Sequence, residues 1–193
     1  NILEGYDLAA LDHNSAEYIY LVSMAMKAAF ADRNRFLADP AFLPTPLEWM
    51  ISKERAAEWR AHIDAGKPIE AASFTPTGSP ETPPVSVVDR PGNCVALTHS
   101  NGGSASGVIT PGLGFFYNNS MINYDPWPGQ ANSIAPGKAR TTGMAPTIVY
   151  KTGKPVLVLG SPGATRIITS NLQVILNVLD FGMSINDAVY APR

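Results

Sequence analysis

Val85-Ser86-Val87-Val88-Asp89, Arg90-Pro91-Gly92-Asn93 and Cys94-Val95-Ala96-Leu97-Thr98-His99 follow one another in the middle of the chain. The two outer segments are rich in valine and other apolar residues, as strands are, and the segment between them is a turn sequence. We therefore predict a β-hairpin over these residues. The hairpin divides the chain, because the residues before it have a helical pattern and the residues after it form further strands and helices.

The residues before the hairpin predict two helices. Asn14-Ser15-Ala16-Glu17 is a capping box, in which we expect the asparagine to accept a hydrogen bond from a first-turn N–H. An apolar stripe follows it to about Arg35. A second helix is predicted to start at Thr45-Pro46-Leu47-Glu48 and to continue to about Ile63. Residues 65–84 have no period and little to bury, so we expect an exposed, mobile linker.

The residues after the hairpin predict a second hairpin and two helices. Thr147–Tyr150 pairs with Pro155–Leu159, and both segments are apolar on both faces, which predicts a sheet covered on each side. A helix is expected from about Thr165 to Asp180, and a short one after the capping box Ser184-Ile185-Asn186-Asp187. This order of elements is typical of a layered α+β domain.

Composition excludes several classes of protein. The chain has 193 residues with one cysteine, three histidines and a net charge of −2. A near-neutral charge gives no reason to expect nucleic acid or an anionic membrane as a partner. One cysteine excludes an internal disulfide framework, and this composition leads us to expect neither a metal site nor a cofactor. No apolar run approaches the ~20 residues of a membrane span.

The edges of the chain suggest an excerpt. It has no initiating methionine and stops at Pro192-Arg193, just after a helical pattern. We expect a longer protein, so the lack of a targeting signal says nothing about its compartment.

Thr82 is the first candidate for chemistry, because it lies between the linker and the first strand. A threonine hydroxyl is a poor nucleophile, but an N-terminal threonine supplies its own base in the α-amine, whose pKa is near ~8. That use requires a cut between Glu81 and Thr82, which an exposed linker permits, and Pro83 keeps Thr82 extended. The residues alone equally allow a plain polar residue in a Pro-rich linker.

Two further segments are candidates. Gly160-Ser161-Pro162-Gly163-Ala164 leads into a helix, so free N–H groups and the helix dipole could hold an oxyanion there. An ordinary strand–turn–helix connection is the alternative. Thr141-Thr142-Gly143 is a polar cluster that could bind a substrate or satisfy its own backbone. No nucleophile elbow, P-loop or dinucleotide fingerprint is present.

Taken together, these residues resemble the γ-glutamyltranspeptidase family of N-terminal nucleophile (Ntn) hydrolases. The matching stretches follow the chain in order and cover nearly all of it: Asn14–Glu17, Ala31-Asp32-Arg33, Thr82 seven residues before Asp89, Gly92-Asn93, Asn118–Met121, Ala145–Ile148, Gly160–Gly163, Arg166–Thr169 and Ala191-Pro192-Arg193. The resemblance implies an α+β fold, part of an αββα sandwich. It also implies a large-subunit-like region over residues 1–81 and a small-subunit-like region over residues 82–193.

The resemblance also implies a chemistry. The precursor would cut itself between Glu81 and Thr82, and Thr82 would then attack a γ-glutamyl amide such as glutathione. The acyl group would pass to water or an amino acid. Gly163 and Ala164 match the residues whose N–H groups form the oxyanion hole, and Asn101 matches a substrate-contacting asparagine.

The implied partners are the missing parts of the fold. These are the rest of the large subunit, which supplies an arginine for the substrate carboxylate, and the C-terminal part of the small subunit. A periplasmic or extracellular location is implied by the resemblance alone.

Four features of the chain depart from the family pattern. Paired serines that hold the substrate carboxylate are here Thr142-Gly143, so one hydroxyl is lost. Gln-Met-Asp-Asp is here Ser120-Met121-Ile122-Asn123, and the neutral Asn123 should weaken recognition of a substrate ammonium unless Asp125 compensates. The second glycine of the oxyanion turn is Ala164, which is tolerated if its φ is negative.

The fourth departure is a spacing, one residue short between Asp89 and Asn119. The second active-site threonine of the family therefore falls on Thr98, His99 or Ser100.

Three functions follow as hypotheses. The first is a γ-glutamyltransferase-like enzyme, and the second is the same chemistry on another amide, such as an acyl side chain or a small dicarboxylic amide. The third is an uncut, inactive homologue.

Overall fold

A computed structural model describes residues 1–71, 82–103 and 105–192. Two compact units are formed. Unit 1 comprises Asn1–Phe74, Tyr124–Thr141 and Ile175–Arg193, and unit 2 comprises Thr75–Asn123 and Thr142–Val174. Half of the predicted linker, residues 72–81 with Glu81, lies outside the described residues, as does Arg193. The predicted division between residues 81 and 82 concerns a cut in the chain and stays a prediction.

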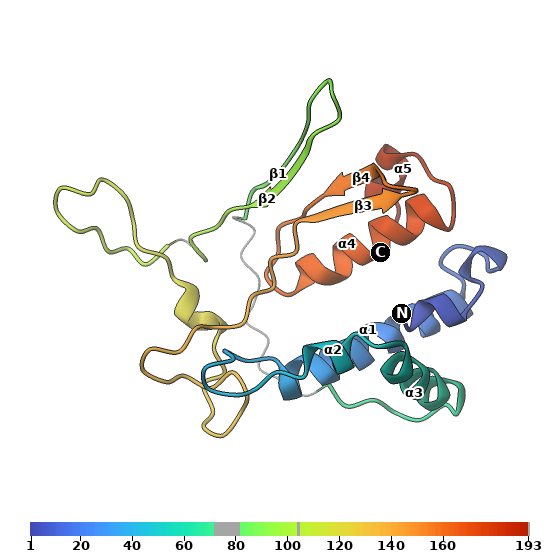
Figure 1. The fold of residues 1–193 in the computed structure, drawn as a ribbon, viewed down its shortest axis with the longest axis horizontal. Helices are drawn as coiled ribbons and strands as arrows, with labels where there is room; N and C mark the ends of the chain where they lie inside the picture. Colours follow the sequence, from blue (N-terminus) through green and yellow to red (C-terminus); the bar gives the residue numbers. More distant parts are fainter. Residues whose placement is uncertain (72–81, 104, 193) are drawn as a thin grey trace. The chain divides into compact units, whose positions relative to one another are not determined.

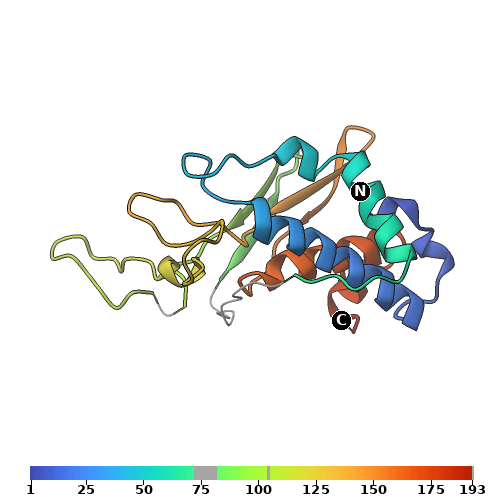
Figure 2. The ribbon, with the colours of Figure 1, turned by 90° about the horizontal axis from the view of Figure 1, so that it is seen from below.

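Unit 1 is built on helices. They are α1 (Ala16–Phe36), α2 (Leu47–Met50), α3 (Lys53–Asp64), the end of α4 (Arg166–Leu179) and α5 (Ile185–Tyr190). Helices α2 and α3 lie beside α1 (Figures 1 and 2). The predicted continuous helix from residue 46 to residue 63 is wrong, because Ser52 starts a new helix by accepting a hydrogen bond from the Arg55 N–H at 3.0 Å.

The predicted cap of α1 is also corrected. Ser15 is the N-cap, and its Oγ accepts from the Tyr18 N–H at 3.2 Å. Asn14 has a left-handed backbone, with φ of 60°, and its side-chain amide donates to the Pro192 carbonyl at 3.0 Å. A capping pattern with two adjacent cap residues cannot tell which one the following chain direction selects. The cap of α5 is confirmed, because Ser184 Oγ accepts from the Asp187 N–H at 3.2 Å.

A buried asparagine ties the N-terminal segment to the end of the chain. Asn177 is 1% exposed, and its Nδ2 donates to the Ala188 carbonyl at 3.1 Å. Its Oδ1 lies 3.0 Å from His13 Nε2. Because the amide nitrogen is used by the carbonyl, the oxygen must be the acceptor from His13. This arrangement specifies that the Nε2 of His13 carries a proton.

A buried carboxylate clamps α3 onto α1. Asp32 is 5% exposed and accepts two hydrogen bonds from Arg55, at 2.9 Å from Nε and 2.6 Å from an Nη. It also accepts from the Trp59 indole N–H at 2.7 Å. The Arg55 guanidinium lies 4.5 Å from the ring centroid of Trp49 and 4.6 Å from that of Trp59. Hydrogen bonding to Asp32 raises the pKa of the Arg55 guanidinium, which therefore keeps its positive charge.

Unit 2 carries two hairpins and the first part of α4. Strand β1 (Pro84–Val88) pairs antiparallel with β2 (Cys94–Thr98), and β3 (Thr147–Lys151) pairs antiparallel with β4 (Lys154–Leu159). Both predicted hairpins and the helix after them are confirmed. Helix α4 lies along the β3–β4 hairpin (Figure 1), where Asn171 donates to the Ala145 carbonyl at 2.6 Å.

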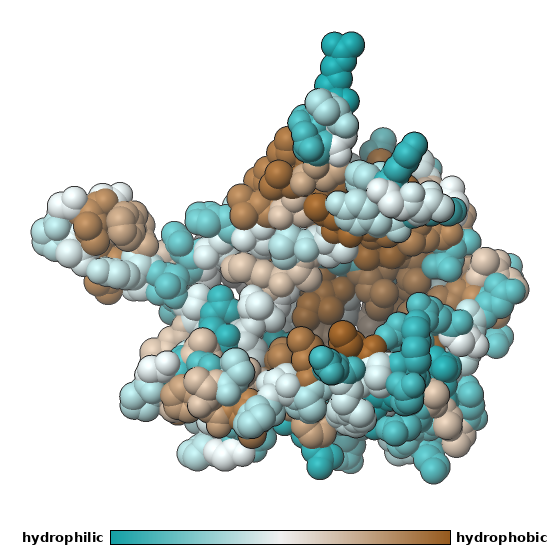
Figure 3. All heavy atoms as spheres, viewed as in Figure 1, coloured by the Kyte–Doolittle hydropathy of each residue, from teal (hydrophilic) through white to brown (hydrophobic). Residues whose placement is uncertain are grey.

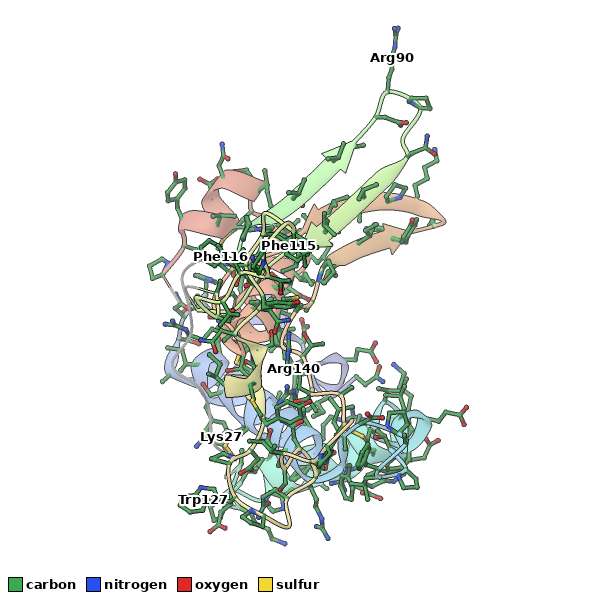
Figure 4. The ribbon with its side chains drawn as sticks, turned by 90° about the vertical axis from the view of Figure 1, so that its left-hand side faces the viewer. Lys27, Arg90, Phe115, Phe116, Trp127 and Arg140 are labelled. Carbon is green, nitrogen blue, oxygen red and sulfur yellow. The ribbon has the colours of Figure 1, made fainter. Side chains whose placement is uncertain are left out.

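The turn of the first hairpin is held by two side chains. Asn93 donates to the Asp89 carboxylate from its side chain and from its backbone N–H, both at 2.7 Å. The side-chain bond is the main reason that the pKa of Asp89 is lowered. Arg90 lies at the tip of this hairpin (Figure 4).

The sheets of unit 2 expose much apolar surface. Val88, Val95 and Leu97 are each more than half exposed on the first hairpin, which is brown in Figure 3. Phe115 and Phe116 project from the loop that follows β2 (Figure 4). We predicted that both faces of the second hairpin are covered. Among the described residues only one face is buried, since Leu157 is buried but Val156 is 48% exposed.

The Asp32 clamp yields a stability prediction. Asp32→Asn removes the buried carboxylate and leaves the mostly buried guanidinium of Arg55 with only the exposed Glu58 as an ionic partner, so we expect a loss of about 3 kcal/mol in the free energy of unfolding. Urea denaturation followed by tryptophan fluorescence measures it, because Trp49 and Trp59 flank Arg55.

The matched control is Glu58→Gln. Glu58 also pairs with Arg55, but its side chain is 58% exposed, so its loss should cost less than about 0.5 kcal/mol. Equal effects of the two variants would contradict a clamp centred on Asp32.

Candidate active site

Thr82 lies two residues before β1 and is 6% exposed. Its hydroxyl donates to Ser100 Oγ at 3.1 Å. The register of the hairpin explains the contact: Pro84 is paired with Thr98, so two residues further along each strand Thr82 faces Ser100. The structure therefore places the predicted nucleophile in a hydrogen-bonded pair of hydroxyls.

The three candidates for the second hydroxyl are now distinguished by position. Ser100 Oγ also accepts from the Gly102 N–H at 3.0 Å, which orients it toward Thr82. Thr98 Oγ1 is buried and has no hydrogen-bond partner among the described residues. His99 is exposed, and its backbone N–H donates to the Pro83 carbonyl at 3.3 Å. Ser100 alone of the three brings a hydroxyl to Thr82, and its role in chemistry stays a prediction.

The turn predicted to bind an oxyanion begins next to the start of β1. A Cβ added to Gly160 would lie 2.9 Å from Pro84 Cβ and 3.6 Å from Thr98 Oγ1. Only a residue without a side chain fits there, because atoms do not approach so closely without a shift. The end of β4 and the start of β1 are thus in direct contact, which places the turn close to Thr82.

Ala164 has a φ of +53°, so the condition under which an alanine fits this position without strain is not met. An alanine held in the left-handed region costs roughly 1–2 kcal/mol, so its surroundings must hold it there. Arg166 N–H donates to the Gly163 carbonyl at 3.0 Å, and Ile167 N–H donates to the Ala164 carbonyl at 3.3 Å. The N–H groups of Gly163 and Ala164 donate to no backbone carbonyl in the described part of the chain.

The Thr142-Gly143 segment lies against this same turn. A Cβ on Gly143 would be 2.7 Å from the Ala164 carbonyl oxygen. Thr142 Oγ1 accepts from the Met144 N–H at 3.1 Å, which shapes the loop. The structure thus brings Gly143 to Ala164, as the hypothesis of a common site requires.

The segment around Asn101 is fastened to the residues before Ser120. Asn119 N–H donates to the Asn101 carbonyl at 2.6 Å, and its side chain donates to Gly103 at 3.2 Å. Gly102 has a φ of +76°, and a Cβ there would lie 3.0 Å from the Asn119 carbonyl carbon. Asn101 follows Ser100 directly, so this contact links the 118–123 segment to the hydroxyl pair.

Ser120 and Asn123 form a short 3-10 turn of their own. Asn123 Nδ2 donates to the Ser120 carbonyl at 3.1 Å, and the Ser120 N–H donates to Asn118 Oδ1 at 2.9 Å. Asp125, considered as a substitute for the missing charge, belongs to unit 1, and its Oδ1 accepts from the Trp127 N–H at 2.9 Å.

The described residues contain no group of three or more histidine, cysteine or acidic side chains placed to hold a metal ion. Of the helices in the same ranges, none is both long and apolar enough to cross a membrane.

The buried Thr82 hydroxyl thus lies just before a strand whose first residue packs on Gly160, where the Gly160–Ala164 turn begins. A model of the family described as Gamma-glutamyltranspeptidase matches residues 1–193, so the chain belongs to the γ-glutamyltranspeptidase family. The predicted family is confirmed.

Three known proteins show the range of the similarity. The Acylase ACY 1 proenzyme of Pseudomonas sp. (strain V22) is 46% identical over 100% of this chain and 35% of its own length. The Glutathione hydrolase proenzyme of Pseudomonas sp. (strain A14) is 38% identical over 100% of this chain and 36% of its own length. The crystal structure of cephalosporin acylase from Bacillus halodurans matches with a TM-score of 0.76 and 28% identity over 100% of this chain and 36% of that one.

The chain therefore spans about a third of the length of the curated relatives it matches. The predicted fold class, part of an Ntn-hydrolase fold, is confirmed by the structural match. The contact between Gly143 and Ala164 could not be predicted from the sequence, because the two residues are far apart in the chain and no local pattern links them.

The hydroxyl pair yields a second prediction. Ser100→Ala removes the acceptor of the Thr82 hydroxyl, so we expect self-cleavage before Thr82 to slow by ~10- to 100-fold through loss of orientation. The appearance of a fragment that begins with Thr82, followed over time by mass spectrometry, measures the rate.

Thr98→Val is the matched control, because it removes a buried hydroxyl that has no partner. We expect its cleavage rate to stay within ~2-fold of the original and its stability to hold or rise. If Thr98→Val slowed self-cleavage and Ser100→Ala did not, Thr98 rather than Ser100 would be the hydroxyl that orients Thr82.

Proposed function

We propose that this chain is the nucleophile-bearing part of a self-processing threonine amidohydrolase. The observation that carries the proposal is the buried Thr82 hydroxyl, hydrogen-bonded to Ser100 at 3.1 Å. It is supported by the turn of Gly163 and Ala164, which begins beside the same strand. Both curated relatives described above are named as proenzymes, which supports a processing step.

The chemistry begins with a cut of the Glu81–Thr82 bond, which frees the α-amine of Thr82. This amine takes the proton from Thr82 Oγ1, and the oxygen attacks the carbonyl carbon of an amide substrate. The N–H groups of Gly163 and Ala164 stabilise the oxyanion. Collapse breaks the C–N bond, the leaving amine takes the proton, and an ester on Thr82 remains for attack by water or an amino acid.

γ-Glutamyl amides are the first substrate class. The family match and the 38% identity to a glutathione hydrolase proenzyme support this choice. The rest of the large subunit and the C-terminal part of the small subunit would complete the site, and Asn101, Ser120, Thr142 and Gly143 would lie around the acyl group.

A second substrate class is favoured by specific residues. Gly143 offers no hydroxyl, and Asn123 is neutral with its Nδ2 donating to the Ser120 carbonyl at 3.1 Å. Both features weaken the recognition of a zwitterionic acyl group, because charge-assisted hydrogen bonds are about twice as strong as neutral ones. An amide whose acyl group lacks the free amino acid end is therefore the second candidate, and the 46% identity to an acylase proenzyme supports it.

Processing yields the third prediction. The full-length protein is expected to give a fragment that begins with Thr82, and Thr82→Ala should stay uncut because no hydroxyl can attack the preceding carbonyl. N-terminal sequencing measures both. Thr98→Val is the control and should mature normally. A permanently intact original protein, or a Thr82→Ala variant that matures, would contradict the mechanism.

Substrate charge yields the fourth prediction. We compare kcat/KM for γ-glutamyl anilide with that for glutaryl anilide, which lacks only the α-amino group. Asn123→Asp should raise the ratio of the first to the second by roughly 10-fold, because a carboxylate attracts the substrate ammonium.

Asn118→Asp is the matched control for charge. It adds the same charge nearby and keeps an oxygen for the Ser120 N–H, so the ratio should change by less than ~2-fold. If γ-glutamyl anilide is not cleaved while another amide is, the first substrate class is wrong and the second replaces it.

A further inference from the structure

Gly143 lies so close to the Ala164 peptide that no side chain fits between them. A Cβ added to Gly143 would be 2.7 Å from the Ala164 carbonyl oxygen, 3.0 Å from the carbonyl carbon and 3.2 Å from Thr165 Cα. The φ of Gly143 is outside the left-handed region, so its backbone conformation alone would allow any residue. The requirement for glycine is therefore one of space.

The group that Gly143 touches is part of the oxyanion turn. The Ala164 carbonyl accepts from the Ile167 N–H at 3.3 Å, on the first turn of α4. Gly143 lies against the same carbonyl, so the peptide is held between the helix start and the glycine. Ala164 keeps its φ of +53° within this contact. A displaced carbonyl changes the ψ of Ala164. Because the left-handed region is small, φ has to change with ψ, and the Ala164 N–H then moves as well.

We propose that Gly143 is a positioning residue for the oxyanion turn, and that through it the choice of substrate is coupled to the rate of the chemical step. The proposal rests on the proposed function of the Gly163 and Ala164 N–H groups. A side chain at position 143 moves the Ala164 carbonyl and misdirects its N–H. Position 143 is also the position at which the hydroxyl for a substrate carboxylate is lost. Restoring that hydroxyl therefore also displaces the oxyanion turn.

The coupling has a consequence for substrate class. Acyl groups that need a second hydroxyl at position 143 are excluded by packing, and Gly143→Ser does not admit them. The serine side chain adds a hydroxyl but displaces the Ala164 peptide, so kcat falls for γ-glutamyl and glutaryl anilides alike. Glycine at position 164 relieves the conflict, because it adopts other torsions and lets the carbonyl turn away.

A double-mutant cycle tests the proposal in the full-length, processed protein. Its variants are Gly143→Ala, Ala164→Gly and the double variant that carries both substitutions. Each is assayed on γ-glutamyl anilide and on glutaryl anilide. Gly143→Ala adds a methyl group without a hydroxyl or charge, and we expect kcat to fall by ~10-fold or more with KM within ~2-fold, since oxyanion donors act in the transition state. Whatever kcat the Ala164→Gly variant has, adding Gly143→Ala to it should lower kcat by much less than adding Gly143→Ala to the original protein does.

The matched control is Gly137→Ala. It adds the same methyl group at a glycine with nothing within 4 Å, although the φ of +73° strains it. We expect Tm to fall and kcat to stay within ~2-fold, which separates strain from misplacement of the turn. Gly143→Ser on γ-glutamyl anilide should behave as Gly143→Ala does.

Thermal unfolding keeps the test independent of activity. Gly143→Ala should lower Tm, and should lower it less in the Ala164→Gly background. If the protein is uncut or cleaves no amide, the proposed function fails, and this difference in Tm alone decides whether Gly143 positions the turn. The inference would be overturned if Gly143→Ala left kcat and Tm unchanged. It would also be overturned if Gly143→Ala caused the same loss in the original protein and in the Ala164→Gly variant.

Discussion

The antiparallel register that pairs Pro84 with Thr98 is the constraint on which the site depends. Residues directly opposite on paired strands share a face, so the register brings Thr82 to Ser100 two residues further on. The same strand start packs on Gly160, where the turn that contains Gly163 begins. A slip of one residue would put His99 or Asn101 opposite Thr82 and remove the hydroxyl pair.

The two departures from the family pattern at positions 143 and 164 meet in space. The first replaces a serine with glycine, and the second replaces a glycine with alanine. In the structure the bare Cα of Gly143 lies against the carbonyl of Ala164, whose backbone is left-handed. Strained backbone persists only where the surroundings over-determine it. The strain at Ala164 is therefore a property of the pair rather than of one residue.

Local patterns predicted most of the elements but not their ends. Both hairpins, the long helices and the Ser184 cap follow from patterns of adjacent residues. The predicted second helix breaks at Ser52. The cap of the first helix is one residue later than expected, because a cap depends on the direction in which the preceding chain arrives. In the sequence, Asp32 is distinguished only as part of the family motif Ala31-Asp32-Arg33. Its role as a clamp required Arg55 and Trp59 from another helix.

The sequence by itself determined the family, the position of Thr82 before a strand and the loss of a hydroxyl and a charge at positions 143 and 123. These are properties of residue identity and order. Only the tertiary structure decided that Ser100 rather than Thr98 meets Thr82, and that Ala164 takes a left-handed backbone against Gly143. The reason is physical: strand register and close packing join residues that lie 18 or more positions apart, and no local pattern encodes a distance between them.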